Sequence, residues 1–450
     1  MRLTDLRALF IQVGAVKLFA KTLAENDNSK NQIYFAGAVE TLNVFPSRQI
    51  FAANTKSGPT FKAQLNFGWL LPSGKVAQAP NAQLILYSQY PEVRFSGFLL
   101  GCSDAPSELM AARPVGRKRT PRELSFLVNR VLFLGVTSSG QIVGYVAAGN
   151  SEIAREFHAS EFPPALSVFR EIPLPNFLDP ITARNRLLSE LRRIHNLGWI
   201  DSKQLGADRV ISPCNAPQCG GYTLEAELGI PKNSAAAPDF LGWEIKQHTV
   251  SNLQTIDVGT ITLMTPEPTG GIYREKGVDS FVRKFGYADK LGRPDRLNFG
   301  GIHKVGIRQS ATGLTLQLQG FDVERCTIAD ATGCLALVSD SGEIAASWAF
   351  SGILEHWSRK HSKTVYVPSL CRTEPSRQYH YGDRVRLAEG TDSLKLLKAL
   401  ALGVIYYDPG IKIENASSIP KIKRRSQFRI ASKAIQNIYQ AVATTELPPA

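Results

Sequence analysis

The stretch DFLGWEIK at residues 239–246 constrains this chain most, because it places charged side chains on an otherwise apolar strand. Side chains two positions apart in a strand share a face, so Glu244 and Lys246 are expected to point the same way. Asp239 precedes them at an expected turn, which can bend its carboxylate toward that face. Charges on a buried strand are costly unless they are paired. The pattern therefore predicts a functional site, although Glu-x-Lys also occurs on solvated strand faces and that alternative stays open.

Glu225 supplies a third carboxylate upstream of this strand. The segment GGYTLE at residues 220–225 predicts a short helix, with Thr223 offering a cap. Three carboxylates converging with one lysine form an oxygen-rich site of the kind that Mg²⁺ prefers. A metal ion in such a site neutralises a phosphate and lowers the pKa of the attacking water. These residues predict a metal-dependent phosphodiester hydrolase.

The first third of the chain contains short apolar or alternating runs separated by turn residues, a spacing typical of an all-β barrel or sandwich. These runs include QIYFAG, AQLNFGWLL, AQLILYSQY, VLFLGVT and QIVGYVAAG. Prolines then cluster at positions 163, 164, 173, 175 and 180, where they favour extended backbone. We therefore expect one domain over residues 1–160, a proline-rich linker over 161–180, and a second domain over 181–450.

The second domain alternates helix and strand, which predicts a mixed α/β or α+β fold. A helix is expected to begin at Asp179-Pro180, with an apolar stripe of leucines and a stop at Gly198. FLGWEIKQ and TITLMT are expected as neighbouring strands. Further elements are expected as the strand CLALVS, a helix over 343–360, the strand TVYVPS and a helix over 392–403.

The charge balance points to a polyanionic partner. The 450 residues include 52 Lys plus Arg and 39 Asp plus Glu, and the net charge of +13 is spread over both halves. Six cysteines are too few for a disulfide scaffold, and no Cys or His pair follows Cys214 and Cys219 at zinc-site spacing. No apolar run is long enough to span a membrane, and no phosphate loop with GK[ST] occurs. We expect a soluble, cytoplasmic protein without a membrane partner.

The segment GGYTLEAELGIPKNSAAAPDFLGWEIK resembles the catalytic signature of the MvaI/BcnI restriction endonucleases, which belong to the PD-(D/E)xK nucleases and are related to MutH. The resemblance implies that Asp239 and Glu244 hold Mg²⁺. It also implies that Lys246 assists the attacking water and that Glu225 supports the metal site. The Gly-x-Thr-Leu-Glu helix, the loop Asn, the Pro-Asp and the Glu-x-Lys are all present at the family's spacing.

The run KIKRRSQFRI at residues 421–430, placed just before an expected last helix, resembles the DNA-reading segment near the C-terminus of that family. Arg425 and Arg429 are the expected readers of guanine edges, because bidentate Arg is the commonest specific contact in the major groove. Lys421, Lys423 and Arg424 are expected on phosphates. A solvated basic loop is the alternative.

The first domain resembles the N-terminal effector domain of EcoRII-type restriction enzymes, a pseudobarrel of the plant-transcription-factor type. The similar segments lie at residues 16–35, 44–46 and 84–98. The resemblance implies two DNA-gripping arms, and their expected contact residues are Lys21, Lys30, Asn31, Gln32, Gln89, Glu92 and Arg94. Asn31-Gln32 stands where that domain has His-Gln, which is a departure in the first arm. An ordinary β-barrel with polar turns is the alternative.

Together these features predict two domains: an N-terminal all-β DNA-binding pseudobarrel, and a C-terminal α/β PD-(D/E)xK restriction-endonuclease-like domain. The resemblances imply a type II restriction endonuclease that hydrolyses double-stranded DNA with Mg²⁺ at a short CCWGG-like site. They also imply a monomer, an allosteric effector domain that engages a second DNA site, and a cognate DNA methyltransferase as a separate protein. Two alternatives stay open: a non-catalytic sequence-specific DNA-binding regulator, and a MutH-like nicking endonuclease.

Overall fold

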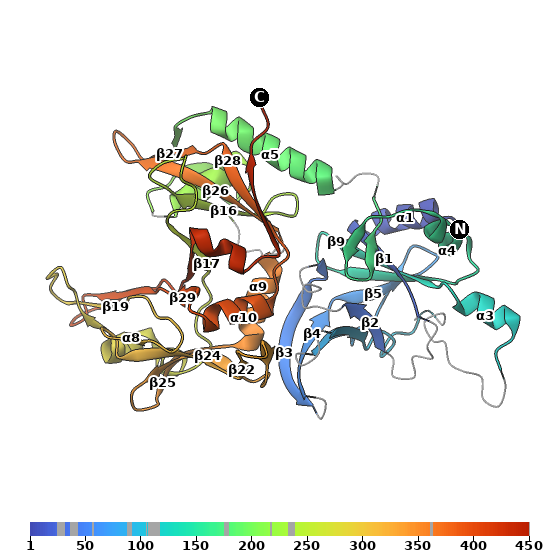
Figure 1. Cartoon of the computed structure of the whole chain (residues 1–450), viewed down its shortest axis with the longest axis horizontal. Helices are drawn as coiled ribbons and strands as arrows, with labels where there is room; N and C mark the ends of the chain where they lie inside the picture. Colours follow the sequence, from blue (N-terminus) through green and yellow to red (C-terminus); the bar gives the residue numbers. More distant parts are fainter. Residues whose placement is uncertain are drawn as a thin grey trace. The chain divides into compact units, whose positions relative to one another are not determined.

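The computed structural model describes residues 1–24, 32–36, 44–55, 58–87, 92–104, 106, 118–174, 180–216, 218–232, 239–360 and 363–449. The chain divides into two compact units, Met1–Asp179 and Pro180–Ala450. Figure 1 shows both units, coloured along the sequence.

The first unit contains a seven-stranded sheet and a five-stranded sheet. In spatial order, the seven-stranded sheet consists of β11 (Pro164–Leu166), β12 (Phe169–Glu171), β1 (Ala15–Thr22), β9 (Val131–Thr137), β10 (Ile142–Ala147), β5 (Phe67–Leu70) and β6 (Val76–Gln78). The five-stranded sheet consists of β2 (Gln32–Ala36), β8 (Glu92–Ser96), β7 (Gln83–Tyr87), β4 (Gly58–Leu65) and β3 (Ser47–Thr55). Phe35 and Phe169 come from different sheets and pack edge to face, with ring centroids 4.8 Å apart.

Two expectations for the first unit need correction. The unit is not all-β, because it also contains the helices α1 (Leu3–Gln12), α3 (Pro121–Leu127) and α4 (Glu152–Ala159). The segment expected as a linker over 161–180 includes β11 and β12, and β12 pairs with β1. Pro164 is accommodated because β11 is the edge strand of its sheet, where a residue without an N–H is tolerated.

The second unit is built around a sheet that contains Glu244 and Lys246. Its strands are β13 (Ile200–Asp201), β27 (Gln378–Tyr381), β26 (Lys363–Arg372), β28 (Arg384–Glu389) and β33 (Ala441–Glu446), with β16 (Glu244–Thr249) paired in parallel to β26. The helix α5 (Pro180–Asn196) buries Leu187, Leu191 and Ile194 in the same core as residues of this sheet. In Figure 1, α5 lies beside the sheet that holds β16, β26 and β28.

The remaining elements of the second unit form smaller sheets and helices. The sheets are β14 (Lys203–Leu205) with β15 (Ile211–Pro213); β17 (Thr260–Met264), β32 (Phe428–Ala431) and β29 (Ile405–Tyr407); β18 (Tyr287–Ala288), β19 (Arg296–Gly300), β30 (Gly410–Glu414) and β31 (Lys421–Lys423); β20 (Arg308–Gln309), β21 (Leu314–Gln319), β24 (Cys334–Ser339) and β25 (Ile344–Ala349); and β22 (Phe321–Asp322) with β23 (Thr327–Ile328). The helices are α6 (Cys219–Glu227), α7 (Ile272–Glu275), α8 (Gly277–Phe285), α9 (Phe350–Lys360), α10 (Ser393–Ala401) and the 3₁₀ helix η2 (Ser432–Asn437).

Several boundaries differ from the sequence-based expectations. TITLMT forms β17 in another sheet, so it is not a neighbour of β16, whose partner is β26. The expected helix over 343–360 starts at Phe350, because residues 344–349 pair with β24 as β25. The expected last helix after residue 430 is the 3₁₀ helix η2, and β33 follows it.

A tight turn precedes β16, so FLGWEIKQ is not the single continuous strand that the sequence predicted. Phe240 and Trp243 exchange backbone hydrogen bonds of 2.9 and 2.8 Å, so they enclose a two-residue loop. Leu241 and Gly242 have φ values of +49° and +85°, as the two central residues of a type I′ turn require. This turn reverses the chain between Asp239 and Glu244.

His303 is a fully buried histidine of the second unit. Its Nδ1 lies 2.8 Å from the carbonyl oxygen of Gly301, and its Nε2 lies 3.0 Å from the Thr312 hydroxyl. The ring stacks on Phe299 at a centroid distance of 5.6 Å. Burial lowers the pKa of His303 to about 4.

We expect Gly242→Ala to lower the free energy of unfolding by about 1–2 kcal/mol, because a side chain at this positive φ is strained although no atom lies within 4 Å of the added Cβ. The matched control is Gly352→Ala in α9, where the added Cβ is also unobstructed but φ is not positive. That change should raise stability by roughly 0.5–1 kcal/mol. Urea unfolding measures both, and equal shifts for the two variants would contradict the strain.

The second unit should lose stability as pH falls from about 6.5 toward 4, since His303 is neutral in the folded state but takes up a proton when the chain unfolds. With an unfolded pKa near 6.5, the loss between pH 7 and pH 5 is about 2 kcal/mol. His303→Asn should reduce this pH dependence while retaining a donor for the Gly301 carbonyl. Urea unfolding at both pH values tests this, and equal pH dependence in the two proteins would contradict it.

Candidate active site

The site forms where the turn after Asp239 leads into β16. Glu244 is 1% exposed, and Lys246 Nζ donates to Glu244 Oε1 at 2.6 Å. The two side chains lie on one face of the strand, as the spacing predicts. The Ile245 backbone N–H donates to Asp239 Oδ2 at 3.0 Å, which holds the Asp239 carboxylate beside the start of the strand.

The negative charges of the three predicted carboxylates all act on the ammonium of Lys246. Burial alone would lower the pKa of the Lys246 ammonium, but the negative charges of Glu244, Asp239 and Glu225 outweigh it and raise that pKa above its usual value. Lys246 is therefore positively charged at neutral pH. It acts as a hydrogen-bond donor and a positive charge in this arrangement, with no lone pair to accept a proton.

Glu225 reaches this site from α6, which crosses beside β16. The helix approaches the strand closely at Gly220, where an added Cβ would lie 2.6 Å from Gln247 Oε1. Gln247 is itself held on β16 by a 2.8 Å hydrogen bond from its Nε2 to the Ser369 hydroxyl of β26. The small residue at the start of the GGYTLE motif thus permits the contact between helix and strand.

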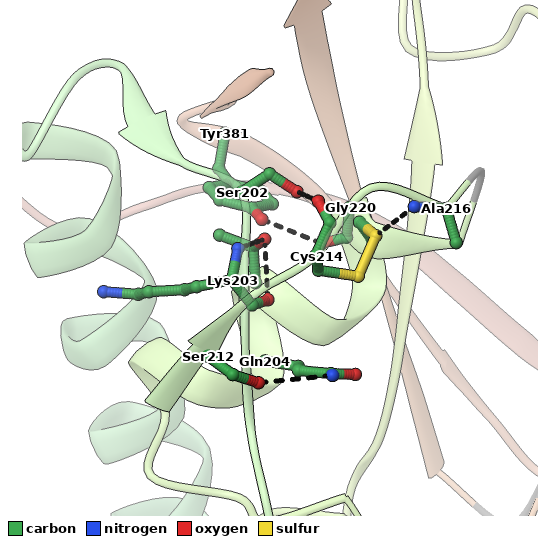
Figure 2. The surroundings of a disulfide bond; sticks show 10 residues. Ser202, Lys203, Gln204, Ser212, Cys214, Ala216, Gly220 and Tyr381 are labelled. Atoms are coloured by element: carbon green, nitrogen blue, oxygen red, sulfur yellow. Dashed lines mark hydrogen bonds between the residues drawn. A yellow bond between two sulfur atoms is a disulfide. The ribbon is translucent and has the colours of Figure 1, made fainter. Parts of the chain in front are cut away.

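The N-terminal part of α6 is anchored by covalent and hydrogen bonds that Figure 2 shows. Cys214 and Cys219 form a disulfide with Cα atoms 5.7 Å apart, which links the chain after β15 to the first residue of α6. Tyr381 Oη donates to the Gly220 carbonyl oxygen at 2.8 Å. The spacing of these cysteines argued only against a zinc site, and their pairing was not predicted.

Thr223 anchors the middle of α6, and its predicted role as a cap is wrong. It is fully buried, its hydroxyl donates to the Lys203 carbonyl oxygen at 3.1 Å, and the Lys203 N–H donates back to it at 3.0 Å. At the far end of the helix, Lys203 Nζ also lies 2.5 Å from Glu227 Oε1. Because α6 starts at Cys219, the residue lies inside the helix and ties it to β14.

Three hydroxyl groups beside Glu244 were not found from the sequence. Thr364 and Tyr366 stand opposite Glu244 and Lys246 in the parallel pairing of β16 with β26. The Tyr439 hydroxyl lies 3.0 Å from both the Thr364 and the Tyr366 hydroxyls. Burial, with a contribution from the negative charge of Glu244, raises the pKa of Tyr439 to about 12. These residues carry no motif of their own, and pairing between distant strands brings them together.

His248, two residues beyond Lys246, is a structural residue. It is 5% exposed, and its Nε2 lies 3.2 Å from the Ile256 carbonyl oxygen. Burial lowers its pKa to about 4, so the ring is neutral at pH 7. It offers no positive charge to a phosphate.

Two carboxylates of the site fit a magnesium ion. Within the part of the chain that the structure describes, no group of three or more His, Cys, Asp and Glu side chains is placed to hold a metal, so Glu225 does not complete a three-residue ligand set. Asp239 and Glu244 remain as oxygen donors beside Lys246. Mg²⁺ usually takes one or two carboxylates and completes its shell with water and substrate phosphates.

The basic run at 421–425 lies on the surface. All five of its residues are exposed, and Lys421 and Lys423 belong to β31. Lys423, Arg424 and Arg425 line a cavity of about 610 Å³ together with Tyr287 and Phe299. The Arg425 carbonyl oxygen accepts from the Gly410 N–H at 2.9 Å, which fixes the backbone at the cavity wall.

Arg429 lies apart from that cavity lining, on β32. Its guanidinium donates to Asp408 Oδ2 at 2.6 Å, and 30% of the side chain is exposed. A role in reading bases would require this ion pair to open or to be shared. Base reading by Arg425 and Arg429 stays a prediction.

Three predicted contact residues of the first unit come together on neighbouring strands. Arg94 donates to Glu92 at 2.7 Å and to the Gln32 side-chain oxygen at 3.2 Å, which joins residues from both expected arms. Lys21 is 7% exposed and its ammonium donates to the Tyr34 carbonyl oxygen, while burial lowers its pKa to about 8. Lys30, Asn31 and Gln89 lie outside the described residues.

Over the described ranges, no helix is long and apolar enough to cross a lipid bilayer.

The solved structures that this chain resembles include two forms of one restriction endonuclease. The chain resembles a complex of restriction endonuclease MvaI with its cognate DNA substrate, with 17% identity, a TM-score of 0.44, and coverage of 58% of this chain and 97% of that chain. It also resembles MvaI in the absence of DNA, with 15% identity, a TM-score of 0.32, and coverage of 59% and 98%. No curated protein matches the sequence.

A family model, described as the MvaI/BcnI restriction endonuclease family, matches residues 188–439. The match covers more than half of the chain and includes Glu225, Asp239, Glu244 and Lys246, whose charges interact. Members of this family are site-specific deoxyribonucleases, and the resemblance seen in the sequence is confirmed for the second unit. This chain belongs to the MvaI/BcnI restriction endonuclease family.

Proposed function

We propose that this protein is a type II restriction endonuclease that hydrolyses double-stranded DNA at a short specific site in a Mg²⁺-dependent reaction. The observation that carries the proposal is the electrostatic environment of Lys246, whose positive charge is maintained by Glu244, Asp239 and Glu225 in a partly buried site. Membership of the MvaI/BcnI family supports the same reaction.

Asp239 and Glu244 would hold the metal, each through a carboxylate oxygen. Mg²⁺ would neutralise the scissile phosphate and lower the pKa of the attacking water. The N–H of Ile245 keeps the Asp239 carboxylate oriented at 3.0 Å. The buried position of Glu244 fixes its carboxylate at the strand start, and Lys246 compensates its charge.

Lys246 would orient the attacking water and stabilise the negative charge that develops on the phosphate. Its raised pKa favours this electrostatic role, because a charged ammonium donates hydrogen bonds and does not accept a proton. Glu225 would support the site from α6 by adding negative charge near Lys246. The disulfide and the Thr223 hydrogen bonds would keep α6 in place for this purpose.

The exposed basic run would bind the DNA near the site. Lys421, Lys423 and Arg424 would contact phosphates, and Arg425 and Arg429 would read guanine edges. Guanines on both sides of the target are consistent with a CCWGG-like sequence, which is the site that we propose. The basic net charge of the chain supports attraction to DNA.

The first unit would act as an allosteric effector that binds a second DNA site. Its candidate surface is the linked set Gln32, Glu92 and Arg94, which presents donors and acceptors on two neighbouring strands. We further propose that the protein acts as a monomer, cuts the two strands in turn, and has a separate methyltransferase that protects the host's own sites.

Purified protein should cut long unmethylated DNA into discrete fragments when Mg²⁺ is present and leave it intact in EDTA. Sequencing the fragment ends should give one short common sequence. Asp239→Ala should lower the cleavage rate by roughly 1,000-fold or more, since a metal ligand is lost, while site-specific binding in Ca²⁺ is retained.

The control for this variant is Asp340→Ala, which removes an exposed carboxylate paired with Arg308 and should leave cleavage unchanged. Undiminished cleavage by Asp239→Ala would overturn the metal assignment. Specific binding without any cleavage by the wild type would identify a non-catalytic regulator. Cleavage that stops after one strand would identify a nicking enzyme.

Residues 180–450 alone should still cut the same site, because this unit is compact and contains the four site residues. Cleavage by this fragment should depend less on a second DNA site than cleavage by the full chain. Plasmids with one and two sites compare the two proteins, and circular dichroism verifies that the fragment is folded. Identical site dependence would remove the effector proposal.

A further inference from the structure

Two apolar side chains project into solvent from the sheet that carries the basic run. Ile419 is 86% exposed and Leu291 is 80% exposed, the highest values for large apolar residues in the described part of the chain. A single exposed leucine is ordinary on a protein surface. Two such residues at one place require a reason when each lies at the end of a hairpin.

The two residues belong to neighbouring hairpin loops at the same end of the sheet's strands. Arg296, the first residue of β19, is paired with Glu414, the last residue of β30. The loops 289–295 and 415–420 therefore leave the sheet at the same end of these two strands. The N–H of Ala416 donates to the Asp295 carbonyl oxygen at 3.1 Å, which joins the loops directly. We call residues 289–295 and 415–420 the double-hairpin tip. Figure 1 shows β19 beside red-orange strands from the C-terminal part of the chain.

Hydrogen bonds keep the double-hairpin tip in shape. Asp289 has a side chain only 5% exposed, and its carboxylate accepts from the Leu291 N–H at 2.9 Å and from Asn298 Nδ2 at 3.0 Å. The Asp295 carboxylate accepts from the Ser417 N–H at 2.7 Å. A tip that is ordered before binding loses little entropy when it makes a contact.

Exposed basic side chains lie on the double-hairpin tip and directly after it. Lys290 and Arg293 are exposed on the first loop, and Lys421 follows the second loop directly. Both acidic residues of the first loop are engaged: Asp289 pairs with Arg296 at 3.1 Å, and the Asp295 carboxylate accepts from the Ser417 N–H. The cavity of about 610 Å³ opens between the hairpins and is lined by Lys290, Leu291 and the basic run. Positive charge around an apolar point matches a polyanion that has apolar faces within it.

We propose that the double-hairpin tip is an apolar wedge that enters DNA, with Leu291 and Ile419 contacting base faces and Lys290 and Arg293 contacting the flanking phosphates. Proteins that deform DNA insert apolar side chains of this kind between base steps and hold the backbone with Lys and Arg. The wedge rests on the proposed DNA binding of the second unit. It extends that binding to a surface outside the predicted base-reading residues.

The test measures binding of the full chain to 30-base-pair duplexes in Ca²⁺ over a range of salt concentrations. Leu291→Ala/Ile419→Ala should weaken binding about 10-fold at every salt concentration, because burial of apolar area is lost while the number of ion pairs is unchanged. Lys290→Ala/Arg293→Ala should instead reduce the slope of log K against log salt by up to about 2. Leu402→Ala, which removes another leucine that is 63% exposed, should change neither quantity.

A second measurement reports on the bases themselves. Duplexes of one sequence carry 2-aminopurine in place of each adenine in turn, and wild-type binding should increase its fluorescence at the entered step. The increase should be absent with Leu291→Ala/Ile419→Ala and present with Leu402→Ala. Unchanged DNA affinity in Leu291→Ala/Ile419→Ala would overturn the wedge. The wedge would also be overturned if sedimentation showed that this variant loses self-association while its DNA binding is unchanged.

The two proposals fail in different experiments. Wild-type protein that binds duplexes but never cuts them in Mg²⁺ would overturn the nuclease and leave the wedge to be decided by the affinities and the fluorescence. Wild-type protein that cuts but shows no difference between the double alanine variant and Leu402→Ala would overturn the wedge alone. Wild-type protein that binds no DNA would overturn both.

Discussion

The site depends on burying the carboxylate of Glu244 next to the ammonium of Lys246. A charged carboxylate that is only 1% exposed is costly unless an opposite charge lies close to it. The Lys246 ammonium supplies that charge at 2.6 Å. Glu244, with smaller contributions from Asp239 and Glu225, in turn keeps Lys246 charged against the effect of burial. Each buried charge in this group is stabilised by the others. The surrounding structure must therefore hold all of these side chains close together.

Three local features hold these side chains in place. The two-residue turn at Leu241-Gly242 brings Asp239 back beside β16, and it accepts a leucine at positive φ to do so. Parallel pairing with β26 places the Thr364 and Tyr366 hydroxyls beside the charged residues. The close approach at Gly220, together with the Cys214–Cys219 disulfide, brings α6 and Glu225 against the strand. Strain and covalent linkage thus gather around the charged group, as is common at functional sites.

Membership of the MvaI/BcnI family places this chain among site-specific deoxyribonucleases, and the charged group is the site that we propose for that hydrolysis. The surfaces that meet DNA are a separate matter. The basic run lines a cavity, Arg429 is held by Asp408, and two apolar residues project from the double-hairpin tip beside them. Specificity in such an enzyme would come from the combination of phosphate contacts, base edges and deformation of the duplex.

The sequence by itself predicted the candidate site residues, because Asp239, Glu244 and Lys246 are close in the chain and the spacing of Glu244 and Lys246 in a strand decides which face they occupy. It also indicated the family, through the resemblance of the segment that contains them. It also determined many strand and helix positions, such as the buried stripe of α5. Only the tertiary structure decided that β16 pairs with β26, that Thr223 fastens α6 to β14, and that the Tyr439 hydroxyl lies beside those of Thr364 and Tyr366. It also decided that Leu291 and Ile419 share one tip. These contacts join residues far apart in the chain, so no local pattern of apolar or charged positions records them.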